Sequence, residues 1–102
     1  MIDNNKVQKI IDERIKMHHD DSRIEDKWKE LTNIFTANES ETIEYLNNCS
    51  EYIVEWVSEV FEDISEVLQS EKFIKCIEIL KSKFENLDLE QDILYAKQAI
   101  NQ

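Results

Sequence analysis

The chain has 102 residues, enough for one domain with its own apolar core, and its 41 % of hydrophobic residues is ordinary for a soluble protein. It contains no glycine and no proline, which argues against hairpin-rich sheets and excludes the glycine-rich phosphate loops of nucleotide-dependent enzymes. A net charge of −11 argues against direct binding to nucleic-acid phosphates. We therefore expect an all-α fold, in which residues 1–102 form a single compact domain of five or six antiparallel-packed helices.

Apolar residues recur at three-to-four spacing in the first third of the chain and predict two amphipathic helices. The first covers residues 3–18. The second begins at a capping box of Ser22 and Glu25 and carries Trp28 on its apolar face. Polar residues 36–38 then predict a break, followed by a short third helix that ends near Asn47 and Asn48, which can replace glycine at a helix C-terminus.

The second half of the chain predicts three further helices. A long one is capped by Ser50 and runs to about residue 68, a fifth begins at Ser70, and a sixth begins at a capping-box-like pair of Asp88 and Gln91. Any positive-φ corner is expected to fall to asparagine. Trp56 and Phe61 suit either the core or an interface. The predicted core consists of Trp28, Phe35, Val57, Ile64, Phe73 and Leu80.

The apolar runs and the cysteines indicate an ordinary intracellular domain. No apolar run approaches the ~20 residues needed to cross a bilayer, so we expect no membrane contact and a cytoplasmic location. Cys49 and Cys76 do not form a CxxC pair, and they are interpreted as small apolar residues rather than a disulfide or a zinc site.

The negative charge is confined to the middle of the chain. Residues 1–29 hold seven acidic and seven basic residues, and residues 72–102 hold five of each. The 42 residues from Glu30 to Glu71 hold eleven acidic residues and no lysine or arginine. Because neither flank has a surplus of cations, we expect a positive charge on another molecule to complete this segment.

The acidic side chains also repel one another. Four acidic i,i+4 pairs lie between residues 51 and 66 of the predicted long helix, and at roughly 0.2–0.5 kcal/mol each they cost about 1–2 kcal/mol. Two alternatives would explain the acidic segment without a partner: cations from other helices neutralise it, or its net charge serves solubility. An unfavourable local pattern is where binding sites are sought. The predicted partner-binding residues are Glu39, Glu41, Glu44, Glu51, Tyr52, Glu55, Glu59, Glu62, Asp63 and Glu66.

The segment MHHDDSRIED, with both histidines of the chain, is the obvious candidate for a metal or acid–base site. Adjacent side chains do not easily converge on one ion, and neither HExxH nor Glu-x-x-His occurs. Helix-end and N-cap roles are expected for His18, His19, Asp20 and Asp21 instead. Nothing ties either cysteine to a histidine, so we predict no catalytic residue, no metal, no cofactor and no enzymatic activity.

Two stretches, MHHDDSRIEDKWKELTNIFTANESETIEYL and EVFEDISEVLQSEKFIKCIEIL, resemble small helical bacterial immunity proteins of polymorphic-toxin systems, including those paired with contact-dependent growth inhibition toxins. The resemblance covers most of the chain and includes no catalytic signature. It implies a protein made beside a secreted or contact-delivered toxin, often a nuclease, whose active site or substrate groove it blocks. No ligand residues follow from the resemblance.

These observations together predict an immunity protein that binds a cognate basic toxin domain, an RNase or a DNase, as a monomer or in a 1:1 complex. A different interpretation is a helical adaptor or regulatory protein that receives an amphipathic partner helix in an apolar groove. A third is a metal-dependent hydrolase centred on HHDD. Affinity that falls steeply with salt distinguishes the first from the second, and bound metal would indicate the third.

Overall fold

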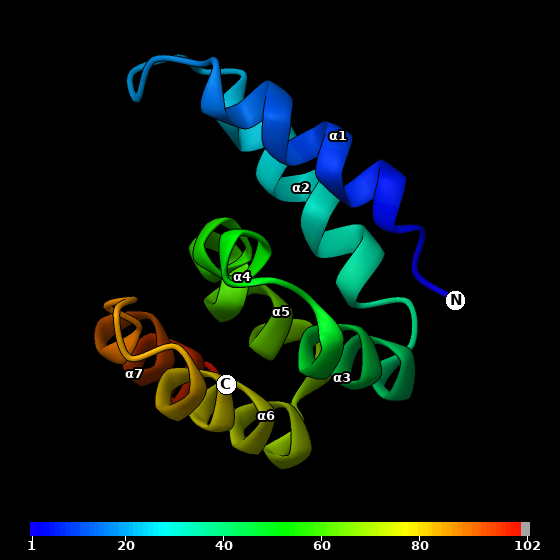
Figure 1. Cartoon of the computed structure of the whole chain (residues 1–102), viewed down its shortest axis with the longest axis vertical. Helices are drawn as coiled ribbons and strands as arrows, with labels where there is room; N and C mark the ends of the chain where they lie inside the picture. The colour runs from blue at the N-terminus through cyan, green and yellow to red at the C-terminus, as the bar shows by residue number, and fades with distance from the viewer. Residues whose placement is uncertain (101–102) are drawn as a thin grey trace.

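Helices account for the whole architecture of residues 1–100, the part of the chain described in the computed structural model (Figure 1). If the interrupted segment 51–68 is counted once, there are six helical segments in this part, and the predicted all-α fold is confirmed. The elements are α1 (Asn4–Ile15), α2 (Ile24–Phe35), α3 (Glu39–Asn48), α4 (Glu51–Val57), the 3-10 turn η1 (Ser58–Val60), α5 (Phe61–Leu68), α6 (Glu71–Lys83) and α7 (Glu90–Gln98).

Four helices begin where short polar side chains cap them, and at α1 the Asp3 carboxylate accepts a hydrogen bond from the Asn5 backbone N–H at 2.9 Å. Asn38 accepts a hydrogen bond from the Glu41 backbone N–H at 3.0 Å, Ser50 from that of Ile53 at 3.4 Å, and Ser70 from that of Phe73 at 3.0 Å. Each satisfies an N–H that has no partner within its own helix. The predicted starts of α3, α4 and α6 are therefore confirmed.

Two predicted capping boxes are wrong. α2 has Arg23 at its N-cap and no side-chain cap, because Asp21 accepts the Arg23 backbone N–H at 2.9 Å and turns the chain before Ser22 can act. α7 likewise begins without a side-chain cap from Asp88. α1 ends at Ile15, three residues earlier than predicted.

The predicted long helix is interrupted. α-Helical structure stops at Val57, residues 58–60 form the tighter η1 turn, and α5 follows after Val60 at φ −115° and ψ 12°. Ser58 Oγ donates to the Glu55 carbonyl at 2.6 Å, a local bond of the kind that bends helices. Only two of the four predicted i,i+4 acidic pairs, 51/55 and 62/66, lie within one α-helix, so their repulsion falls to about 0.4–1 kcal/mol.

The turn after α5 contains a non-glycine residue in the left-handed backbone conformation. Gln69, at φ 48° and ψ 49°, ends α5, whereas asparagine was expected to take any such position. Its side-chain amide donates to the Glu66 carbonyl at 2.9 Å and to the Ala99 carbonyl at 2.8 Å. The side chain thereby joins the end of α5 to the residue that follows α7.

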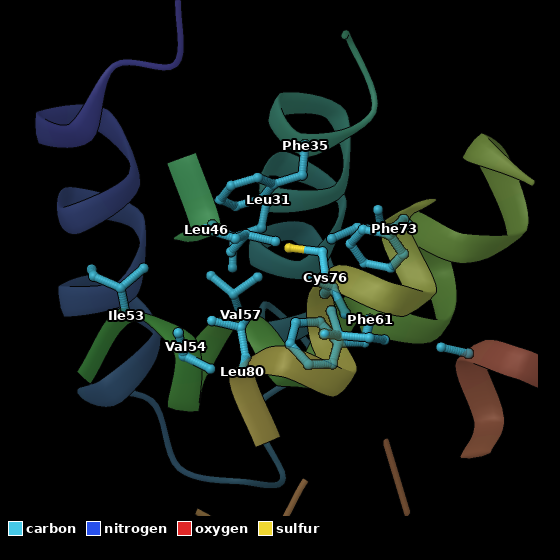
Figure 2. Close-up of a cluster of buried hydrophobic side chains, with 14 of the residues drawn as sticks. Leu31, Phe35, Leu46, Ile53, Val54, Val57, Phe61, Phe73, Cys76 and Leu80 are labelled. Atoms are coloured by element: carbon cyan, nitrogen blue, oxygen red, sulfur yellow. The ribbon is translucent and has the colours of Figure 1, made fainter. Parts of the chain in front are cut away.

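The helices enclose one apolar core. α1 and α2 lie antiparallel along one side of it, while α5 packs on α7 and α3 packs on α6 (Figure 1). Figure 2 shows part of the cluster, in which the Phe61 and Phe73 rings meet edge to face with centroids 6.0 Å apart. Of the predicted core, Phe35, Val57, Ile64, Phe73 and Leu80 are fully buried.

The structure also shows the burial of the aromatic residues that suited either the core or an interface, and of the two cysteines. Phe61 is fully buried, whereas Trp28 and Trp56 are half-buried at the core margin. Cys76 is buried and Cys49 is half-buried, both as free thiols. Burial raises the pKa of each thiol to about 11. Within residues 1–100, no helix has both the length and the apolar character needed to cross a bilayer.

Candidate partner-binding surface

The ten predicted contact residues do not form one continuous stripe. The interruption at η1 separates α4 from α5, and α4 contacts α1 whereas α5 contacts α2. Three areas result, one at the start of α3, one on α4 beside α1, and one on α5 beside α2. Glu59, on η1, belongs to none of them.

The negative charge of Glu59 is paired with a cation of the same chain. Its carboxylate accepts from Arg14 Nε at 3.0 Å and Nη2 at 2.9 Å, and from the Trp28 indole N–H at 3.1 Å. The Arg14 guanidinium also lies 5.3 Å from the centroid of the Trp56 ring. Only 12 % of the Arg14 side chain and 26 % of the Glu59 side chain are exposed. The expectation that this carboxylate lacks a cation of its own is wrong.

Two other acids of the middle segment also have partners. Lys27, which bonds Glu13 at 3.0 Å between α1 and α2, reaches Glu30 at 3.1 Å. Glu41 contacts the amino group of Met1 at an exposed site. Within residues 1–100 the other eight acidic residues of the segment have no ion pair, and they are Glu39, Glu44, Glu51, Glu55, Glu62, Asp63, Glu66 and Glu71.

The area at the start of α3 adjoins the N-terminus of the chain. A depression of about 980 Å³ is lined by Glu41 and Glu44 together with residues of α1 and α4. Tyr45 donates its hydroxyl to Asn4 Oδ1 at 2.7 Å, and burial raises the pKa of Tyr45 to about 12. A neutral, bonded tyrosine therefore fixes one wall of this depression.

The area on α4 centres on Tyr52, which is 38 % exposed. Its hydroxyl donates to Asp12 Oδ1 of α1 at 3.1 Å. Partial burial, this hydrogen bond and the negative charges of Asp12 and Glu55 raise the pKa of Tyr52. The predicted contact residue is therefore accessible, but its hydroxyl already bonds within the chain.

The area on α5 is hollowed. Asp63, Glu66 and Val67 face α2 across a groove of about 380 Å³. Burial raises the pKa of Asp63, and the negative charge of Glu66 adds to this increase. In this α2–α5 groove, predicted contact acids line a concave surface beside the aromatic side chain of Trp28, and sequence patterns gave no sign of the groove.

The HHDD segment lies in the exposed turn between α1 and α2. His18, His19 and Asp20 offer donor atoms within 4.8 Å of one another, and all three are exposed. The predicted helix-end role of the histidines is wrong, because α1 ends at Ile15. The Asp21 carboxylate bonds the Arg23 guanidinium at 2.7 Å, which lowers the pKa of Asp21 to about 2.

No family model matches this chain, and no curated protein or solved structure is similar to it.

Proposed function

We propose that this chain is an immunity protein that binds and neutralises a cognate basic toxin domain, a nuclease of the RNase or DNase class. The observation that supports this function is the set of eight acidic residues on α3 to α6 without a cationic partner in residues 1–100. Three cations that do reach the segment, including Arg14 and Lys27, leave this set unmatched.

A basic nuclease surface complements these carboxylates. Enzymes that hold nucleic-acid phosphates use lysine and arginine, and a dense array of carboxylates can occupy the same groups. Opposite fields accelerate association and discriminate against partners of the wrong sign. The resemblance to toxin immunity proteins supports a toxin as the source of that surface.

A helical adaptor is the second candidate, and exposed apolar side chains on α6 and α7 favour it. Ile79 is 60 % exposed, and Leu94 is also exposed. Leu94 lines a depression of about 640 Å³ between α6 and α7, where Lys97 bonds Glu78 at 2.8 Å. An amphipathic partner helix would cover these side chains by apolar contact, with little dependence on salt.

The test uses the purified protein and the small basic domain encoded in the adjacent reading frame. Calorimetric titration at low and high salt, together with a nuclease assay of the domain, measures binding and inhibition. We expect a complex that blocks cleavage and weakens steeply as salt rises. A complex whose affinity is constant with salt would favour the adaptor, and the lack of any complex would reject the proposal.

Charge reversal locates the contact face. Glu55→Lys with Glu62→Lys reverses two unpaired carboxylates and leaves the internally bonded Glu59 unchanged. The matched control is Glu85→Lys with Glu90→Lys, which makes the same charge change at exposed positions of the α6–α7 side. Equal affinities for the two double variants would reject the acidic face as the binding surface.

A further inference from the structure

The α2–α5 groove combines a charged rim with an apolar wall. α2 contributes Glu25, Trp28 and Lys29, and α5 contributes Asp63, Glu66 and Val67. The two helices contact one another, and Figure 1 shows α5 below α2. A volume of about 380 Å³ is close to the lower limit of ligand pockets, which suits one side chain better than a whole helix.

The net negative charge of the groove favours a cationic ligand. Three carboxylates and one ammonium line it, and within residues 1–100 neither Asp63, Glu66 nor Lys29 forms an ion pair. Asp63 and Glu66 stand one turn apart on α5, so two acceptors face the same space. Desolvation of Asp63 in the groove and the negative charge of Glu66 raise the pKa of this carboxyl.

The apolar wall of the groove suits a ligand side chain with a long aliphatic portion. Val67 is 61 % exposed, the most exposed aliphatic residue of α5. Trp28 stands beside it, and its indole N–H is already bonded to Glu59. The polar atom of the ring is thus satisfied, and the remaining carbon surface is available for packing.

We propose that the α2–α5 groove receives an arginine side chain of the partner protein, whose guanidinium binds Asp63 and Glu66 while its stem packs on Val67 and Trp28. Arginine has the planar, multidentate donor set that two carboxylates require, and it packs on aromatic rings more readily than lysine does. The identity of the partner rests on the proposed function, whereas the chemistry of the groove does not.

The two tryptophans provide a direct test by NMR. Their indole N–H groups give two separate signals in the ¹⁵N-labelled protein, which substitution of Trp28 by Phe assigns. The probe is the neutral-ended peptide acetyl-Ala-Arg-Ala-amide. We expect the Trp28 signal and the amide of Val67 to shift on titration, while the Trp56 signal stays in place. The same peptide with citrulline, which is neutral and similar in shape, should cause no shift.

Matched variants separate the groove from general charge. Asp63→Asn with Glu66→Gln removes two charges from the groove, and Glu51→Gln with Glu55→Gln removes two from α4. We expect the first variant to abolish the peptide-induced shifts and the second to retain them. Equal shifts in both variants, or an equal response to the citrulline peptide, would overturn the proposal.

The full partner distinguishes this inference from the proposed function. We expect Asp63→Asn with Glu66→Gln to weaken the complex by about tenfold or more, and the α4 variant to weaken it less. Undiminished binding by the groove variant would overturn the arginine site and leave the immunity function intact. Failure of the partner to bind at all, with peptide shifts still at Trp28, would reject that function and support the groove.

Discussion

The Arg14–Glu59 pair should contribute more to stability than any other ion pair of the described chain. Replacing Glu59 by Gln keeps its size but leaves the guanidinium, with only 12 % of its side chain exposed, without a counter-charge. Exposed pairs contribute about 0.2–1 kcal/mol, and breaking fully buried ones costs about 3–5 kcal/mol. This half-buried, two-bond pair lies between them, so we expect a loss of about 2 kcal/mol in the free energy of unfolding.

A double-mutant cycle isolates the pairwise interaction. Urea unfolding followed by far-UV circular dichroism gives the stabilities of Glu59→Gln, Arg14→Met and the double variant, and a coupling of about 1–2 kcal/mol is expected. The corresponding loss of about 2 kcal/mol for Glu59→Gln lowers the melting temperature by about 8–16 °C. Glu62→Gln, at an exposed and unpaired carboxylate, is the control and should change stability by less than about 0.5 kcal/mol. If Glu59→Gln is no more damaging than this control, or if coupling is absent, Glu59 does not have the role assigned to it.

Three smaller effects follow from other contacts. Ser65→Ala removes the 2.6 Å bond from α5 to the Ala96 carbonyl of α7 and should cost about 1 kcal/mol in urea unfolding, whereas an unchanged midpoint would show that this buried bond adds nothing. The pKa of Asp63 is raised in the folded state above its ordinary value of 3.8, so the folded state binds this proton more tightly. The stability of the wild type relative to Asp63→Asn should therefore rise as the pH falls from above the raised pKa towards 3.8. Parallel pH profiles of the two proteins would contradict this. With a pKa of about 11, Cys49 should react with an aromatic disulfide reagent at pH 8 roughly 100-fold more slowly than an ordinary thiol, and an ordinary rate would refute its burial.

Local patterns predicted the helices well because helices depend on local chemistry. The apolar spacing defined six segments, and Asn38, Ser50 and Ser70 fixed three of their starts. The failures occurred where another contact competed. The bond from Asp21 to the backbone of Arg23 displaced the expected Ser22 cap, and the turn at residues 58–60 interrupted a segment whose apolar pattern is continuous.

The pairing of the acidic side chains was harder to predict because charge pairing is not local. The balanced flank at residues 1–29 suggested that no cation was available to the middle, yet Arg14 reaches Glu59 across 45 positions of sequence. A segmental count of charges gives the total but not which side chains meet. The α2–α5 groove escaped prediction for the same reason, since Trp28 and Asp63 come together only through tertiary packing.

The hydrogen bond from Trp28 to Glu59 has a consequence for binding kinetics and affinity. It immobilises an aromatic wall of the α2–α5 groove in the unbound protein, so the loss of rotational freedom at that ring accompanies folding rather than complex formation. Glu59 can therefore tighten the proposed complex indirectly, through preorganisation of the surface next to it.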